Sequence, residues 1–353
     1  MAPAPLIIGV DAGGTKTTAW LAQLTIPPAQ LNAQQPLHPA IDILGRGAAG
    51  PGNPRALGYA AAALAIATAI QAAYTDAAIH LRPAAAACLA VAGAGRAQEQ
   101  SQLRTLCEEQ HLADRLQLMG DAAPVLAAAY GDQPVGSLAT LRGIALISGT
   151  GSLAWGCNGL AADGRLQQAR AGGWGYLLGD EGSGYAIALA GLRAACRAAD
   201  GIGPATRLLP ALLQRLRLRR PTDLIESIYG QPLDRRRLAQ LAPVIMELAD
   251  VSNTTADPVA VQIIQQASDD LAAMVRGVHQ QLGFEFADGS AHLLDKLPLA
   301  LAGGVLVQGQ PLRQLLEKEL APLGLRAVPV EEPVLGSLYL AAALAAGVCL
   351  ADC

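Results

Sequence analysis

Short apolar runs that end in glycine or an acid recur along the chain, and longer stretches with helical periodicity lie between them. Residues 6–10 and 17–24 predict the first two strands, with a turn at Gly13 and Gly14 between them. Further strands are predicted at 41–45, 86–92, 116–119, 144–147, 153–155 and 297–303, and helices at 55–75, 97–111, 122–130, 336–351 and over most of 185–285. Because strands alternate with helices, the pattern predicts an α/β chain.

The opening pattern returns in the middle of the chain. Residues 143–156 read GIALISGTGSLAWG, in which an apolar strand again runs into a small-residue turn with a threonine, and a second apolar strand follows. This weak repeat of the hairpin around Thr15 predicts two related domains whose turns face a shared cleft. We expect the first domain at 1–120, closed by a helix at 336–353, and the second, with helical insertions, at 121–335.

Length and composition limit the class of protein. The 353 residues are too many for one ordinary core, and 52% of them are apolar, so two domains with large cores are expected. Only 15% are charged and the net charge is −4, which argues against a nucleic-acid partner. The arginine-rich stretch 215–221 is more typical of the solvated end of a helix than of a nucleic-acid patch.

Two long apolar stretches, 56–74 and 334–351, rely on alanine and glycine rather than leucine and isoleucine. They predict buried helices rather than membrane spans, and the N-terminus lacks the basic segment of a signal peptide. None of the six cysteines forms a C-x-x-C pair or lies at zinc-ligand spacing from a histidine. Reduced thiols in a cytoplasmic protein are therefore expected.

The turn within GVDAGGTKTT, residues 9–18, is suited to binding phosphate. Its glycines would expose backbone N–H groups with no Cβ in the way, and Thr15 and Lys16 add a hydroxyl donor and a positive charge. Asp11 would repel a bare phosphate but fits if it holds a Mg²⁺ ion that bridges phosphate oxygens. The P-loop and G-x-G-x-x-G spacings are absent, and a plain hairpin turn remains the alternative.

The densest motif is GGWGYLLGDEGSGY, residues 172–185, with six glycines, one tryptophan and two acids. Trp174 offers a flat apolar face suited to a sugar ring or an acyl group. Asp180 and Glu181 can accept hydrogen bonds from hydroxyl groups. The alternative is a tight junction between a strand and a helix, with Trp174 in the core.

Asp121 lies between the predicted strand 116–119 and the predicted helix 122–130. Its structural role would be to cap that helix. Its chemical role would be that of a general base that takes a proton from an attacking hydroxyl group. The residues alone leave the two roles equally open.

Together these motifs resemble those of the actin-like, hexokinase-like and Hsp70-like ATPase superfamily. GVDAGGTKTT is similar to its first phosphate motif, SGTGS (148–152) to its second and LAGGV (301–305) to its adenosine motif. GGWGYLLGDEGSGY is similar to the more specific signature of the N-acetylglucosamine and glucosamine kinases, which are grouped with the BadF/BadG/BcrA/BcrD ATPases. The resemblance covers nearly the whole chain and implies two RNase H-like α/β domains with an interdomain cleft.

The resemblance implies an ATP-dependent kinase that phosphorylates the 6-hydroxyl of an amino sugar, N-acetylglucosamine or glucosamine, with Mg²⁺ as cofactor. Asp121 matches the catalytic base and binds the sugar, and Asp11 would hold the metal. Further sugar contacts would come from Asn53, Gly173, Trp174 and Asp180, and ATP contacts from Gly13, Gly14, Thr15, Lys16, Gly149, Thr150, Gly151, Gly303 and Gly304.

Two other functions stay open: a sugar or nucleotide sensor without turnover, and an ATPase that activates a partner enzyme. Activators of 2-hydroxyacyl-CoA dehydratases need cysteines for an iron–sulfur cluster, and Cys157 and Cys196 are not placed in such a motif; the zinc motif of ROK sugar kinases is also absent. Segments 25–40, 133–142 and 157–171 look longer than a minimal family member needs and are predicted to be surface loops. A homodimer is expected from the apolar tail and middle helices.

Overall fold

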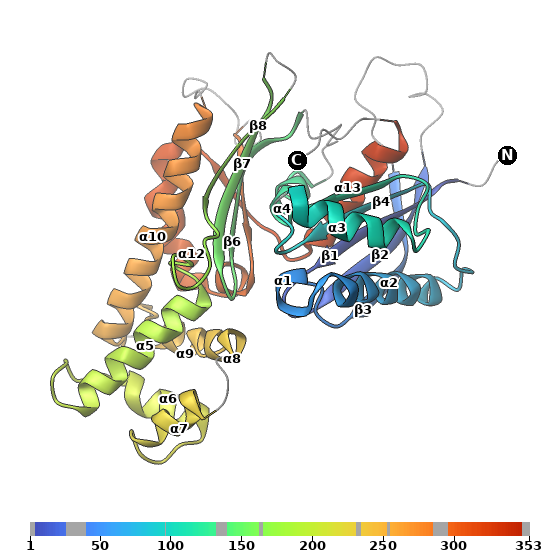
Figure 1. The fold of residues 1–353 in the computed structure, drawn as a ribbon. Helices are drawn as coiled ribbons and strands as arrows, with labels where there is room; N and C mark the ends of the chain where they lie inside the picture. Colours follow the sequence, from blue (N-terminus) through green and yellow to red (C-terminus); the bar gives the residue numbers. More distant parts are fainter. Residues whose placement is uncertain are drawn as a thin grey trace. The chain divides into compact units, whose positions relative to one another are not determined.

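The computed structural model describes residues 4–25, 40–95, 97–131, 140–161, 165–230, 234–252, 255–284 and 296–347. Contacts between residues divide the chain into two compact units (Figure 1). Unit 1 consists of Met1–Ala145, Gly156–Gln168 and Glu332–Cys353, and unit 2 of Leu146–Trp155 and Ala169–Glu331. The domain boundary after residue 120 stays a prediction; the contacts group residues 121–145 with unit 1.

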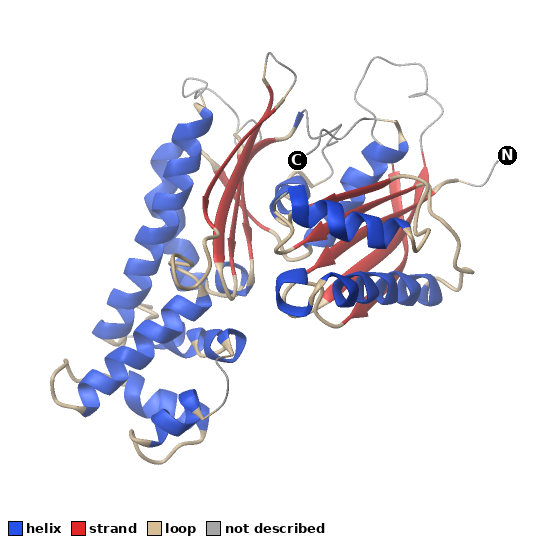
Figure 2. Ribbon diagram, in the orientation of Figure 1, coloured by secondary structure: helices blue, strands red, loops and turns tan. Residues whose placement is uncertain are grey.

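The first sheet lies in unit 1 and has the strand order β3-β2-β1-β4-β5 (Figure 2). Its strands are β1 (Leu6–Ala12), β2 (Thr17–Thr25), β3 (Ala40–Ala49), β4 (Ala86–Val91) and β5 (Leu116–Met119). β2 is antiparallel to β1 and β3, whereas β4 is parallel to β1 and β5. Because β1, β4 and β5 run in the same direction, their carboxyl ends meet at one edge of the sheet.

The helices of unit 1 are α1 (Pro54–Leu57), α2 (Tyr59–Asp76), α3 (Ala97–Glu108), α4 (Ala122–Ala128) and α13 (Pro333–Ala345). They bury β1 on both faces, which accounts for its nearly continuous apolar run. On one face, Ile8 belongs to the same core cluster as Ile66 of α2 and Leu103 of α3. On the other face of β1, α13 packs so closely that a Cβ at Gly9 would lie 2.7 Å from the amide nitrogen of Leu338.

The second sheet has the strand order β10-β9-β6-β7-β8. Its strands are β6 (Arg142–Ser148), β7 (Ser152–Leu160), β8 (Leu166–Gly172), β9 (Pro298–Ala302) and β10 (Arg326–Pro329). Read from β8 to β10, this order repeats that of the first sheet, with β6, β7, β8, β9 and β10 in the places of β1 to β5. The chain is therefore an α/β protein with a duplicated, RNase H-like sheet topology, as the repeat of the hairpin motif predicts.

The helices of unit 2 are α5 (Gly184–Ala199), α6 (Leu208–Leu216), α7 (Asp223–Tyr229), α8 (Arg235–Ala239), α9 (Ala242–Leu248), α10 (Pro258–Leu282), α11 (Gly304–Val307) and α12 (Gln310–Leu320), followed by a short 3-10 helix at Ala321–Leu323. Most of them lie between β8 and β9 in sequence, which confirms the predicted helical character of 185–285.

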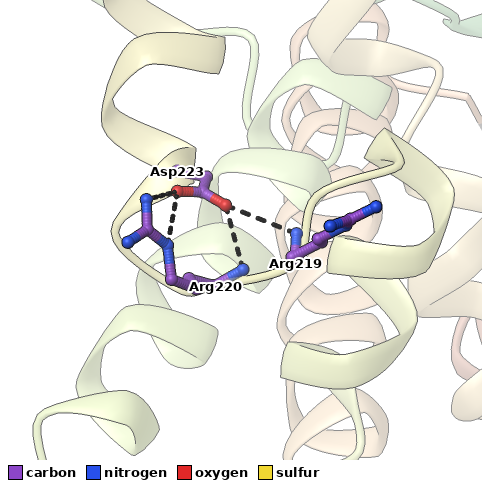
Figure 3. Close-up of polar contacts among 3 residues, drawn as sticks. All are labelled: Arg219, Arg220 and Asp223. Atoms are coloured by element: carbon purple, nitrogen blue, oxygen red, sulfur yellow. Dashed lines mark hydrogen bonds and ion pairs between the residues drawn. The ribbon is translucent and has the colours of Figure 1, made fainter.

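The arginine-rich stretch 215–221 lies at the end of α6, as interpreted from the sequence. There Arg220 pairs with Asp223 at the start of α7 (Figure 3).

Parts of the element prediction are wrong. β3 continues to Ala49, beyond the strand predicted at 41–45, and it requires glycine at position 47 because a Cβ there would lie 2.0 Å from the carbonyl oxygen of Ala69 in α2. Much of 157–171 forms the end of β7 and most of β8, a largely polar strand at the sheet edge. The strand β10 and the helix α12 were not predicted. Predicted loops at 25–40 and 133–142 fall mostly outside the described residues.

Most of the two apolar stretches lies in α2 and α13, and both helices contribute buried residues to unit 1. The predicted helix 55–75 is divided at Gly58 into α1 and α2, and the predicted helix 336–351 ends at Ala345. Across the part of the chain that the structure describes, no helix combines the length and the apolar character needed to cross a bilayer.

Candidate active site

The first glycine turn joins β1 to β2 and leaves Thr15 and Lys16 exposed. The turn is closed by a hydrogen bond from the Gly13 amide to the Lys16 carbonyl, 2.9 Å long. It is also bound to the loop after β3, because the Gly52 amide donates to the Gly13 carbonyl at 2.9 Å. Exposed donors on a turn with fixed ends are suited to an anionic ligand.

Asp11 lies at the end of β1 beside this turn, and Asp121 directly precedes α4, after β5. Both are half-buried. The pKa of Asp11 is raised to about 7, mainly by burial and also by the charges of Asp121 and Glu332, while Lys16 opposes the shift. Burial also raises the pKa of Asp121, which its own backbone N–H partly lowers. The sheet edge therefore holds two carboxyl groups whose charged forms burial disfavours, and Lys16 and a backbone N–H offset this only in part.

Asp121 does not cap α4. Its backbone is helical, with φ −70° and ψ −16°, and its side chain makes no capping hydrogen bond. The capping role that the sequence left open is therefore wrong, and the structure offers no other structural role for this half-buried carboxylate.

The pair fits Mg²⁺ better than a metal held by protein ligands alone. Among the described residues, no three His, Cys, Asp or Glu side chains form a group that could hold a metal ion. Mg²⁺ commonly binds through one or two carboxylates and completes its octahedron with water and the phosphates of a nucleotide. Asp11, beside the glycine turn, has the chemistry and the excess negative charge for that role.

Asn53 lies at the same edge of unit 1. It caps α1 by accepting a hydrogen bond from the Arg55 amide at 2.9 Å. Its amide group lies against the turn after β4, where a Cβ at Gly93 would come within 2.7 Å of Asn53 Oδ1. Gly93 also has a φ of +85°, so both backbone and space require glycine there.

The second glycine turn joins β6 to β7, and hydrogen bonds fix it to the 180–184 segment. The Gly184 amide donates to the Gly149 carbonyl at 2.8 Å, and the Ser152 hydroxyl donates to the Glu181 carbonyl at 2.6 Å. A Cβ at Gly149 would meet no atom within 4 Å, and its φ is not left-handed. The fold of unit 2 therefore does not require glycine at this position, whereas a ligand in contact with the backbone would.

Asp180 is buried beneath the second turn. Its carboxylate accepts a hydrogen bond from the Ser152 amide at 3.3 Å and lies 3.8 Å from Arg235 of α8. Its φ of +64° is unusual for a residue other than glycine. Burial raises its pKa, while the Ser152 amide and the Arg235 guanidinium lower it. Arg235 was missed by sequence reasoning, because only the fold brings it to Asp180.

Trp174 is not a core residue, so that part of the structural alternative for the 172–185 motif is wrong, although the motif does join β8 to α5. Its side chain is 62% exposed, and the Arg170 guanidinium lies 5.1 Å from its ring centroid. Leu177 and Leu178 in the same loop are 80% and 78% exposed. The loop presents an apolar surface next to the buried Asp180, which suits a ligand with both apolar and polar faces.

The structure groups the predicted residues by unit. Unit 1 brings together Asp11, Gly13, Gly14, Thr15, Lys16, Asn53 and Asp121, and unit 2 contains Gly149, Thr150, Gly151, Gly173, Trp174, Asp180, Gly303 and Gly304. Gly303 follows β9 and approaches the second turn, since its Cβ would lie 2.2 Å from the Ser148 carbonyl oxygen. Sequence reasoning also missed Glu332 at the start of α13, which no local motif marks.

A duplicated RNase H-like topology, with a glycine turn after the first strand of each sheet, defines a protein of the actin-like ATPase class. A family model confirms the assignment: residues 8–341 match the BadF/BadG/BcrA/BcrD ATPase family. This chain belongs to that family, as its motifs predict.

The chain is similar to two curated kinases. It is 31% identical over 226 residues to an N-acetylmuramic acid/N-acetylglucosamine kinase of Clostridium acetobutylicum, covering 64% of this chain and 66% of that protein. It is 33% identical over 186 residues to an N-acetyl-D-glucosamine kinase of Dictyostelium discoideum, covering 52% of this chain and 53% of that protein. The matches thus span less than two thirds of each curated relative.

A solved structure is similar over more of the chain. It comes from Chromobacterium violaceum and is provisionally described as an N-acetylglucosamine kinase. The TM-score is 0.68 at 27% identity, and the match covers 96% of this chain and 99% of that one.

Proposed function

We propose that this protein is an ATP-dependent kinase that transfers the γ-phosphoryl group of Mg-ATP to the 6-hydroxyl of N-acetylglucosamine. The observation that carries the proposal is the Asp11–Asp121 pair at the edge of the first sheet. Asp121 has no capping hydrogen bond, and burial raises its pKa, a shift that makes the carboxylate a stronger base.

In the proposed reaction, Asp121 accepts the proton of the 6-hydroxyl while that oxygen forms a bond to the γ-phosphorus. The bond between the γ-phosphorus and the β,γ-bridging oxygen breaks, and ADP leaves with that electron pair. Backbone amides of the turns at Gly13 and Gly149, with Thr15 and Thr150, would hold the phosphates. Asp11 would hold Mg²⁺, which would offset the charge on the β- and γ-phosphate oxygens.

The remaining predicted contacts complete the proposal. Gly303 and Gly304 would face the adenosine. Asn53, Gly173, Trp174 and Asp180 would bind the sugar, with the exposed Trp174 ring against its apolar face.

The acetylated sugar is favoured over the free amine. A free amine would be charged and would need a carboxylate, and the 172–185 motif offers two. The Asp180 carboxylate is already paired with Arg235 and bonded to the Ser152 amide, whereas Glu181 is exposed. The names of both curated relatives also specify N-acetylated sugars.

The proposal is tested by coupled measurement of ADP release from Mg-ATP with N-acetylglucosamine, glucosamine, N-acetylmannosamine, N-acetylmuramic acid and glucose. We expect turnover with N-acetylglucosamine and at most weak turnover with glucosamine. ADP release that no sugar stimulates, or an iron–sulfur absorption spectrum, would instead support an activating ATPase. Binding of ATP or sugar with no ADP release would support a sensor.

A cytoplasmic location and a homodimer are part of the same proposal. Among the described residues, the cysteines at positions 88, 107, 157 and 196 form no disulfide, which suits a reducing compartment. Size-exclusion chromatography with light scattering would test the dimer.

A further inference from the structure

Asn53 is held on a very short element. Its helix, α1, has four residues, of which only Pro54 is buried, and it ends at Gly58 with a φ of +83°. A helix of this length is not stable by itself, because the first turn is costly to form. The position of Asn53 must therefore depend on contacts that α1 makes with the rest of unit 1.

Arg55 supplies such a contact. Its guanidinium binds Glu99 of α3 with two hydrogen bonds, from Nε to Oε1 at 2.9 Å and from Nη2 to Oε2 at 3.2 Å. Two parallel N–H···O bonds fix orientation as well as distance. The Glu99 side chain is only 14% exposed, so it is the better-anchored partner, whereas the Arg55 side chain is 48% exposed.

The ion pair connects the two segments that enclose the Asn53 amide. Asn53 lies two residues before Arg55 and caps the same short helix through the Arg55 amide. Gly93, against which the amide rests, lies in the turn that leads into the helix of Glu99. The Asn53–Gly93 contact and the Arg55–Glu99 pair are therefore two points of attachment between the same two segments.

The other end of the loop is bound to the first glycine turn. Thr17, which is fully buried, donates its hydroxyl hydrogen to the Gly50 carbonyl at 2.9 Å, and the Gly52 amide donates to the Gly13 carbonyl. These bonds fix the loop as far as Gly52, directly before Asn53. The Asn53 side chain itself contacts the Arg55 amide and the turn at Gly93.

We propose that Arg55 and Glu99 are positioning residues: their ion pair holds α1 against α3 and so orients the Asn53 amide for the sugar. The inference rests on the proposed function. It assigns to this pair an effect on sugar affinity that is larger than its effect on stability, because a partly exposed ion pair stabilises a fold only weakly.

The test compares Arg55→Ala with Arg276→Ala. Arg276 pairs with Glu319 at 2.8 Å, with side chains 47% and 24% exposed. The distance and exposure are similar to those of the Arg55–Glu99 pair, although a single guanidinium nitrogen of Arg276 bonds the carboxylate, and the pair is far in sequence from any proposed site residue. We expect Arg55→Ala to raise the KM for N-acetylglucosamine about 10-fold and to leave the KM for ATP within about 2-fold. Arg276→Ala should change neither, and the Tm of both variants should fall by similar small amounts.

Two further measurements separate positioning from general damage. The double variant Arg55→Glu/Glu99→Arg should recover part of the sugar affinity that Arg55→Ala loses. Salt should raise the sugar KM of the unaltered protein more than that of Arg55→Ala, because the exposed pair is screened. An unchanged sugar KM in Arg55→Ala, or equal increases in both KM values, would overturn the inference.

Failure of the inference can be told apart from failure of the proposed function. Calorimetric titration of N-acetylglucosamine gives a Kd that does not depend on turnover. If the unaltered protein binds the sugar but does not phosphorylate it, the kinase proposal fails, and the ratio of Kd values in Arg55→Ala still decides the positioning role. If the unaltered protein does not bind the sugar at all, both fail.

Discussion

At the scale of single residues, the site is defined by negative charge that the protein does not neutralise. Asp11 and Asp121 lie at the same sheet edge, and the carboxylate of Glu332 adds to the repulsion. Only Lys16 opposes it among the charges that act on Asp11. Sites with such unbalanced charge are costly to the fold and are typical of function.

Replacement of Asp121 by Asn should remove catalysis but not folding. We expect kcat to fall by more than about 100-fold, because general base catalysis is lost, while the Kd for N-acetylglucosamine changes little. Steady-state kinetics and calorimetric titration measure the two quantities. Asp114→Asn, at an exposed site in the same unit, is the control. Near-normal turnover of Asp121→Asn would refute the general-base role.

Replacement of Asp11 by Asn should stabilise the metal-free protein at high pH. A carboxyl whose pKa rises from 3.8 to about 7 on folding binds more protons in the folded state, so stability is lost as pH rises from about 4 to 7. Asp11→Asn removes that loss, and we expect the free energy of unfolding of the variant to be higher by about 1–4 kcal/mol at pH 8. At pH 4 the variant and the unaltered protein should be equally stable.

Urea unfolding in EDTA at pH 4 and pH 8 measures this difference, with the exposed Asp200→Asn as control. A gain of the same size at both pH values would mean that the charge of Asp11 is not its cause.

At the scale of elements, close backbone approach decides where helices lie on the first sheet. α13 contacts both β1 and α4, and a Cβ at Gly336 would lie 1.8 Å from the Pro124 carbonyl oxygen. Nothing in the sequence around Gly336 distinguishes it from a glycine that is merely tolerated in a helix. The requirement exists only in the packed structure.

Gly336→Ala should therefore be strongly destabilising, by more than about 2 kcal/mol, although alanine favours helices. Gly277 in α10 gives the matched control, because a Cβ there would meet its nearest atom at 4.0 Å. Gly277→Ala should stabilise the protein by about 0.5–1 kcal/mol. Thermal unfolding of both variants tests the contrast, and equal effects would contradict the packing argument.

Element prediction from the sequence succeeded where apolar runs were buried on both faces, as in β1, β4 and β9. It failed for β8, because a polar edge strand has no apolar pattern, and it ended β3 too early, because the glycines that admit α2 interrupt the apolar pattern. In the site, the glycine turns and acids could be predicted because they are local. Arg235, Glu332 and Gly93 could not, because tertiary contacts alone give them their partners.

At the scale of the whole molecule, two sheets of the same topology carry one glycine turn each. A ligand that binds only the folded state raises the free energy of unfolding. We expect saturating Mg-ATP, at about 100 times its Kd, to add about 2.7 kcal/mol to the free energy of unfolding.

Thermal unfolding with ATP, with and without Mg²⁺, tests this prediction. EDTA should remove most of the gain together with all turnover, because the Asp11 carboxylate would then repel the nucleotide phosphates. A gain in Tm that EDTA does not reduce would exclude Asp11 as a magnesium ligand.

The packing of α13 on β1 also has a consequence for synthesis. The Ser337 hydroxyl donates to the Val10 carbonyl, so one face of the first strand is completed by residues made more than 300 positions later. At about 5–20 residues per second, a ribosome needs about 15–70 s to cover that interval. During this time one face of the nascent first sheet stays uncovered, which makes chaperone binding to the emerging chain an expected part of its biogenesis.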